Sequence, residues 1–206
     1  MTQTLLDLLG RVSRAGVWLG GIAFIVVSFL VTVEVILRKV FLIGLSVATE
    51  LSAYTLAIAS AWAYAFALLN RAHVRVDAGV RLLPRRTIIW VDVLALLALT
   101  WFAGMLVWHG AGVFGWSFKV KAVAMTPLQT PMWIPQGLWL LGLILFLLTC
   151  LALLARAFAL AAVGRGREMT AIIGTFSAEE EAAHEAQEAE KRQRELARVG
   201  RKGAGS

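Results

Sequence analysis

The side chains that could do acid–base or metal chemistry are few and far apart in this sequence of 206 residues. His73 and Asp77 stand four positions apart and could relay a proton or hold a metal, because histidine titrates near neutral pH and is a common ligand. Two residues do not complete a metal site, and a polar loop that contacts a partner is the alternative. The sequence contains no nucleophile constellation, phosphate-binding loop or paired carboxylates. It therefore favours a protein that is not an enzyme and holds no cofactor or metal.

Three further ionisable residues lie at the junction of two long apolar runs. Glu34 and Arg38 are four residues apart and share a helix face, with the acidic residue first, which is the better order for an ion pair. Glu50 follows after a short turn. A charge in mid-membrane costs about 2.5–3.5 kcal/mol on the insertion scale, so these side chains should face protein or water. Either all three form a cluster that locks the hairpin or docks a partner, or Glu34 and Arg38 reach the lipid headgroups as an interfacial pair.

The composition is that of an integral membrane protein. Hydrophobic residues make up 59% of the chain and charged residues only 16%, so a water-soluble fold would expose far more apolar surface than such folds tolerate. The net charge of +7 comes largely from arginines beside the apolar runs, which indicates orientation and contact with anionic lipid headgroups. Nucleic-acid binding is therefore not expected. The lone Cys150 excludes an internal disulfide framework.

Four apolar runs are long enough to cross a bilayer, since about 20 helical residues span its hydrocarbon core. We therefore expect an all-α membrane protein with a four-helix transmembrane domain at residues 16–162. The expected spans are residues 16–41, 47–69, 87–118 and 134–162.

A short segment precedes this domain and a charged one follows it. Residues 1–15 mix leucines with Asp7, Arg11 and Arg14, a pattern that suits a short amphipathic helix lying at the membrane surface. A cleaved signal peptide is less favoured, because the next apolar run is too long for a signal core. Residues 163–206 are expected to form a charged cytoplasmic tail, either helical from the capping box at Ser177 or solvated and partly disordered.

Basic residues predict the orientation, because loops rich in Lys and Arg stay in the cytoplasm. Ten arginines flank the spans on one side, and five of them lie between Arg71 and Arg86. Four basic residues flank the spans on the other side, namely Arg38, Lys39, Lys119 and Lys121. Four spans with both termini in the cytoplasm satisfy this bias.

Two stretches are suited to contacts with other chains. The second run carries Trp62 among many alanines, and small residues let membrane helices approach closely, so we expect it to contact another chain as well as its own neighbours. The segment from Lys119 to Gln136 contains Pro127, Pro131 and Pro135. Prolines at this density prevent a continuous helix and favour extended backbone at the periplasmic surface.

Several motifs, in this order, resemble the small membrane subunit of tripartite ATP-independent periplasmic (TRAP) transporters, the DctQ-like family. The resemblance covers residues 16–162. The motifs are Glu34-Val35-Ile36-Leu37-Arg38-Lys39-Val40-Phe41, Thr49-Glu50-Leu51, Trp62, His73-Val74-Arg75-Val76-Asp77 with Leu83-Pro84, Thr126-Pro127-Leu128, and Pro131-Met132-Trp133.

The resemblance implies a multi-pass protein of the bacterial inner membrane that serves as a fixed scaffold. In that family a large membrane subunit carries the substrate and sodium sites, and a soluble periplasmic binding protein delivers an organic acid. The expected partners are therefore that large subunit, the binding protein and membrane lipid. The chain itself is expected to bind neither substrate nor ion.

Within that interpretation we assign two surfaces. The expected partner interface comprises Glu34, Arg38, Glu50, Trp62, His73 and Asp77. The expected docking site for the binding protein comprises Lys119, Lys121, Thr126, Pro127 and Pro131, where basic side chains could steer an acidic partner.

A haem- or quinone-associated membrane anchor subunit of a respiratory enzyme is the alternative, because such subunits have this size and number of spans. A haem held by two histidines needs both at one depth. The three histidines here, His73, His109 and His184, are expected in the cytoplasm, at the periplasmic side and in the tail. A channel acting alone is weaker still, because the spans lack a ring of polar residues.

Overall fold

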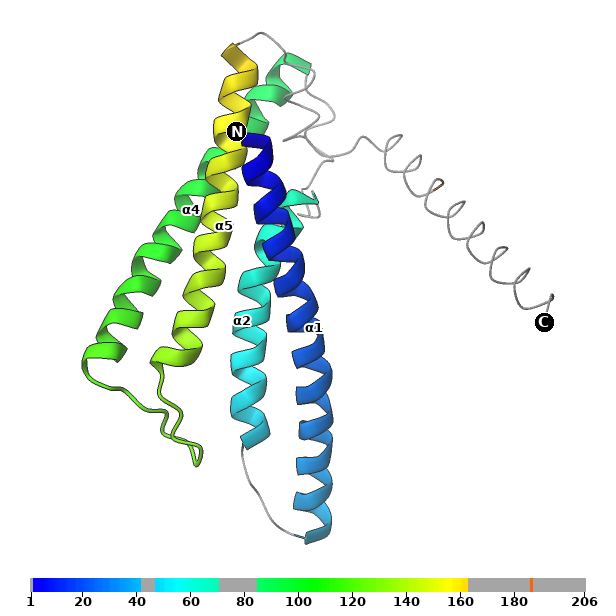
Figure 1. The fold of residues 1–206 in the computed structure, drawn as a ribbon, viewed down its shortest axis with the longest axis vertical. Coiled ribbons are helices and arrows are strands. Elements are labelled where there is room, and N and C mark those ends of the chain that lie inside the picture. Colours follow the sequence, from blue (N-terminus) through cyan, green and yellow to red (C-terminus); the bar gives the residue numbers. More distant parts are fainter. Residues whose placement is uncertain (1, 42–46, 71–84, 163–185, 187–206) are drawn as a thin grey trace, which may run out of the picture. The chain divides into compact units, whose positions relative to one another are not determined.

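The computed structural model describes residues 2–41, 47–70, 85–162 and 186, and the structural statements below refer to these residues. It contains four helices: α1 (Thr2–Phe41), α2 (Val47–Leu69), α4 (Arg85–Lys119) and α5 (Trp133–Ala162) (Figure 1). Each is long and apolar enough to cross a membrane. The expected all-α fold with four transmembrane helices is confirmed.

The first helix differs from the prediction at its beginning. A separate amphipathic helix at the membrane surface was expected for residues 1–15, but α1 runs without a break from Thr2 to Phe41. Its first leucines are packing residues, because Leu6 and Leu9 are buried in the core. Ser13 is also completely buried, and its hydroxyl donates to the carbonyl of Gly10 at 3.2 Å. Leu6 and Leu9 are therefore covered by neighbouring helices, whereas Leu5, Leu8 and Val12 of the same segment are exposed.

The helices pack in the order α1, α2, α5, α4, so α1 and α4 are the outer members (Figure 1). α2 packs against both α1 and α5, and α4 packs against α5. α5 is the most buried of the four spans. This arrangement is a row with two outer helices, and it leaves most of the surface of α1 and α4 uncovered by the chain itself.

The main apolar core draws on all four helices. It includes Leu6 and Leu9 of α1, Ala65 of α2, Leu96 of α4 and Leu153 of α5. The beginning of α1 and the end of α5 lie at the same end of the bundle along the helix axes, as an even number of spans requires (Figure 1). The loop between α4 and α5 lies at the opposite end of the bundle, where the polar groups described next are found.

Close contact between the helices depends on small residues, as the alanine-rich second span predicted. A Cβ added at Gly20 of α1 would lie 2.8 Å from the Cβ of Ala59 on α2. A Cβ at Gly142 of α5 would lie 2.9 Å from the Cβ of Ala61. Both distances are shorter than real Cβ contacts, so only glycine allows α2 to approach α1 and α5 this closely.

Candidate functional site

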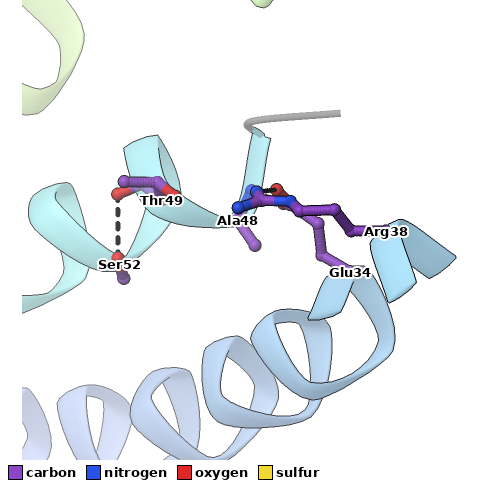
Figure 2. A network of polar contacts seen from close by, with 5 residues as sticks. All are labelled: Glu34, Arg38, Ala48, Thr49 and Ser52. Atoms are coloured by element: carbon purple, nitrogen blue, oxygen red, sulfur yellow. Dashed lines mark hydrogen bonds and ion pairs between the residues drawn. The ribbon is translucent and has the colours of Figure 1, made fainter. Parts of the chain in front are cut away.

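The first polar group joins α1 to the beginning of α2. Glu34 accepts a hydrogen bond from Arg38 Nη2 at 2.7 Å through Oε1, and from the backbone N–H of Ala48 at 2.8 Å through Oε2 (Figure 2). Ala48 lies in the first turn of α2, where backbone N–H groups have no partner within the helix and the helix dipole favours a negative charge. Glu34 is buried, whereas the Arg38 side chain is 55% exposed. The carboxylate of α1 therefore caps the next helix and closes the hairpin.

Glu50 lies in a second polar group with different neighbours. Its Oε1 accepts the hydroxyl of Tyr54 at 2.8 Å, and that hydroxyl lies 3.7 Å from the sulfur of Met132. The hydroxyls of Thr126 and Thr130 lie beside the Glu50 carboxylate. These two hydroxyls and Glu50 Oε2 are buried, but none of the three oxygens makes a hydrogen bond of ordinary length and angle. Glu50 is thus turned toward the loop between α4 and α5.

The expected cluster of Glu34, Arg38 and Glu50 is therefore divided between two groups. The reason is helical geometry, because each residue turns the side chain by about 100° around the axis. Ala48 faces α1, and Glu50 comes two positions later, so it points to roughly the opposite side of α2. The ion pair of Glu34 with Arg38 forms as predicted. Glu50 instead lies beside the loop that joins α4 to α5.

The loop between α4 and α5 folds back on itself, whereas extended backbone was expected. Val123 and Pro131 form an isolated antiparallel bridge. The N–H of Ala124 donates to the carbonyl of Thr130 at 3.0 Å, and a turn is closed by the bond from Gln129 N–H to the Thr126 carbonyl, also 3.0 Å. Pro127 occupies the second position of that turn, which suits its fixed φ angle. Pro127 therefore helps to shape a reversal, whereas α4 has already ended at Lys119.

The expected docking residues divide into outward-facing and inward-facing ones. Lys119 at the end of α4 is exposed, as are Lys121, Pro127 and Pro131 on the loop. Thr126 is partly buried beside Glu50, so it supports the loop from within. The loop also exposes two large apolar side chains that the sequence analysis did not single out, Met125 and Leu128. No periodic pattern in the sequence marks them, and only the reversal of the backbone brings them to the tip.

Trp62, expected at a partner interface, is held within the chain. Its indole N–H donates to the backbone carbonyl of Leu138 on α5 at 3.0 Å. A Cβ added at Gly16 of α1 would lie 2.5 Å from the Trp62 ring, and one at Gly142 of α5 would lie 2.7 Å from it. The ring therefore fits against two helices at positions where neither has a side chain.

One comparison with known proteins identifies a family. The sequence model for the DctQ component of tripartite ATP-independent periplasmic transporters matches residues 27–160. The chain belongs to the DctQ family. DctQ chains are membrane components of these transporters and not enzymes, and the four apolar helices are consistent with a multi-pass protein of the inner membrane. No curated protein and no solved structure matches the chain.

The matched part of this DctQ chain contains both polar groups and the loop between α4 and α5. The segment that holds Leu6 and Leu9 precedes the match, although the two leucines belong to the same core as α5.

The histidines of this DctQ chain are only partly within the described residues. His73, Asp77 and His184 lie outside them. His109 on α4 is exposed, and its Nδ1 lies 2.9 Å from the carbonyl of Met105 one turn earlier. The described parts of the chain contain no group of three or more acidic, histidine or cysteine side chains that could hold a metal ion. Asp92 is buried in α4.

Proposed function

We propose that this DctQ chain is the fixed scaffold subunit of a sodium-coupled transporter that takes up an organic acid. It packs against the large membrane subunit, which carries the substrate and sodium sites and moves during transport. A periplasmic binding protein delivers the substrate to the assembled complex. The chain itself binds neither substrate nor ion, and both of its termini are cytoplasmic.

The contacts of Trp62 are the observation that carries the scaffold role. One side chain of α2 is packed against Gly16 of α1 and Gly142 of α5, and its N–H is bonded to the α5 backbone. Sliding of any of these helices past another would force the ring into backbone or break that bond. Close-packed contacts of this kind have few alternative arrangements, which favours a rigid body over a moving element.

The two polar groups support the same role at the end of the bundle that carries the loop between α4 and α5. Glu34 ties α1 to α2 through the N–H of Ala48, and Glu50 and Tyr54 of α2 lie beside Thr126 and Met132 of the loop before α5. The buried carboxylates therefore face other parts of this chain. On the proposed orientation this end is periplasmic, and the exposed Lys119 and Lys121 meet the binding protein. His73 and Asp77 remain proposed contacts with the large subunit on sequence grounds.

Transport and distance measurements on the reconstituted complex test the proposal. Uptake into liposomes should require the large subunit, this chain, the binding protein and an inward sodium gradient. For the distances, spin labels are placed at the exposed positions Val40 and Phe118, with Cys150 replaced by alanine. The distance between these labels should be the same in two conditions, one without sodium and one with sodium and loaded binding protein. The distance between two labels on the large subunit should differ between these conditions.

Two results would overturn parts of this proposal. A shift of the Val40 and Phe118 labels comparable to that in the large subunit would exclude a fixed scaffold. Uptake that is independent of the sodium gradient would exclude sodium coupling and leave the scaffold role standing.

A further inference from the structure

One face of α4 carries four exposed tryptophans in a line. Trp90, Trp101, Trp108 and Trp116 are 75%, 74%, 79% and 69% exposed, respectively. Leu94 and Met105 lie between them at helical spacing and are also exposed. α4 is an outer helix of the row (Figure 1), and the other described helices leave this face exposed. We call these six residues the tryptophan face.

The depth of two of the tryptophans is unusual for contact with lipid. Tryptophan is enriched where the membrane meets water, which accounts for Trp90 and Trp116 near the two ends of the span. The helix α4 has 35 residues, from Arg85 to Lys119. At about 1.5 Å per residue, Trp101 lies about 2 Å and Trp108 about 9 Å from its centre. An aromatic belt does not account for these two residues.

The indole N–H groups give a second reason to expect a protein partner. Mid-membrane polar groups need a hydrogen-bond acceptor, and lipid tails supply none. This chain satisfies Trp62 in that way, through the carbonyl of Leu138. For Trp101 and Trp108, no acceptor is found among the described residues. A partner that covers the face can provide one.

The shape of the face suits a helix. Gly104 lies between Trp101 and Trp108 on the same side of α4, and a Cβ added there would meet nothing within 4 Å. The position belongs to an open, mostly apolar groove between α4 and α5, whose lining includes Trp101, Trp108, Leu147 and Leu151 together with the polar Thr100 and His109. Membrane helices approach each other most closely where one of them has a small residue. The two indoles and the glycine between them form a recess for a neighbouring backbone.

The area of the face is sufficient for a stable contact. A buried tryptophan contributes about 150–250 Å², so four at the observed exposures offer roughly 450–750 Å². A standard interface buries about 800 Å² on each partner. Leu94 and Met105 supply most of the remainder. Tryptophan is also among the residues that carry most of the binding energy at interfaces.

We propose that the tryptophan face, centred on Trp101, Gly104 and Trp108, binds an apolar transmembrane helix of the large subunit. That helix presents a small residue to Gly104 and a backbone carbonyl or hydroxyl to the indole N–H groups. The inference rests on the proposed function and specifies which surface of the scaffold holds its partner. The face shares no residue with the expected interface residues Glu34, Arg38, Glu50, Trp62, His73 and Asp77.

Substitution of Gly104 by leucine tests the proposal. The variant Gly104→Leu adds a side chain where this chain leaves open space, so its own helices should form normally, and circular dichroism of the purified chain checks this. Affinity purification through this chain should recover at least tenfold less large subunit than the wild type does. Gly21→Leu is the matched control, because Gly21 on α1 also has nothing within 4 Å of an added Cβ, and its recovery should be unchanged.

Photo-crosslinking gives a readout that does not depend on that variant. A benzophenone amino acid in place of Trp108 should capture the large subunit in native membranes, and the same group in place of the exposed Trp18 should not. Capture of a second copy of this chain, or of lipid alone, would overturn the proposal. Recovery of the large subunit at the wild-type level by both leucine variants would overturn the docking face and leave the proposed function intact. Absence of the large subunit from the wild-type purification would overturn the proposed function and this inference with it.

Discussion

The Glu34 carboxylate accepts the backbone N–H of Ala48 at 2.8 Å, across 14 positions of sequence, and so joins the end of one membrane helix to the beginning of the next. The same carboxylate holds Arg38 through its other oxygen. Because Glu34 is buried and Arg38 is largely exposed, the two partners should contribute unequally to the hairpin.

Replacement of Glu34 by alanine should therefore destabilise the chain more than replacement of Arg38. Glu34→Ala leaves a buried N–H group without its acceptor, which costs about 1–3 kcal/mol. Arg38→Ala removes the exposed partner of the ion pair, and the buried Glu34 carboxylate keeps its hydrogen bond from the N–H of Ala48. Thermal unfolding of the purified membrane complex measures both, and the melting temperature should fall further for Glu34→Ala. Glu34→Gln keeps an acceptor for Ala48, so its melting temperature should lie between those of the wild type and Glu34→Ala. Equal loss for Glu34→Ala and Arg38→Ala would contradict the capping role.

Addition of a methyl group at Gly142 should separate α2 from α5. A Cβ there would lie 2.7 Å from the Trp62 ring and 2.9 Å from Ala61, so Gly142→Ala should cost about 1–3 kcal/mol through overpacking. Gly21→Ala is the control, since its Cβ would meet no atom within 4 Å and alanine favours helix over glycine. Thermal unfolding in detergent should show a lower melting temperature for Gly142→Ala and an equal or higher one for Gly21→Ala. The same change in both would exclude close packing at Trp62 as the cause.

Reversal of charge at Lys119 and Lys121 should slow transport without dissolving the membrane complex. Both side chains are exposed on the proposed periplasmic loop, and basic groups there would speed encounter with an acidic binding protein. In proteoliposomes, Lys119→Glu with Lys121→Glu should raise the concentration of loaded binding protein needed for half-maximal uptake. The difference from wild type should shrink at high salt, because surface charges are screened over about 10 Å at 0.1 M. Lys39→Glu, in the last turn of α1, is the control. Unaltered uptake by the double variant would reject docking at this loop.

Much of the fold follows from local patterns in the sequence. The lengths of the apolar runs predicted four spans, and the observed helices begin and end within a few residues of the predicted bounds, apart from the beginning of α1. The spacing of Glu34 and Arg38 predicted their ion pair, because four residues make slightly more than one helical turn. The ordered motifs identified the family, which the match over residues 27–160 establishes.

Other features depended on which element covers which face, and a periodic pattern does not contain that information. The leucines at Leu6 and Leu9 define an apolar face equally suited to a membrane surface and to a neighbouring helix, and only the packing of α1 shows that they are core residues. Glu50 was grouped with Glu34 because the two are close in sequence, yet its position two residues after Ala48 turns it toward another loop. Trp62 meets Gly16 and Gly142 only because three helices converge on it. The sequence by itself determined the number of spans, the family and the ion pair within α1, whereas the tertiary structure decided the contacts between helices, because these depend on rotations and crossings that no single helix specifies.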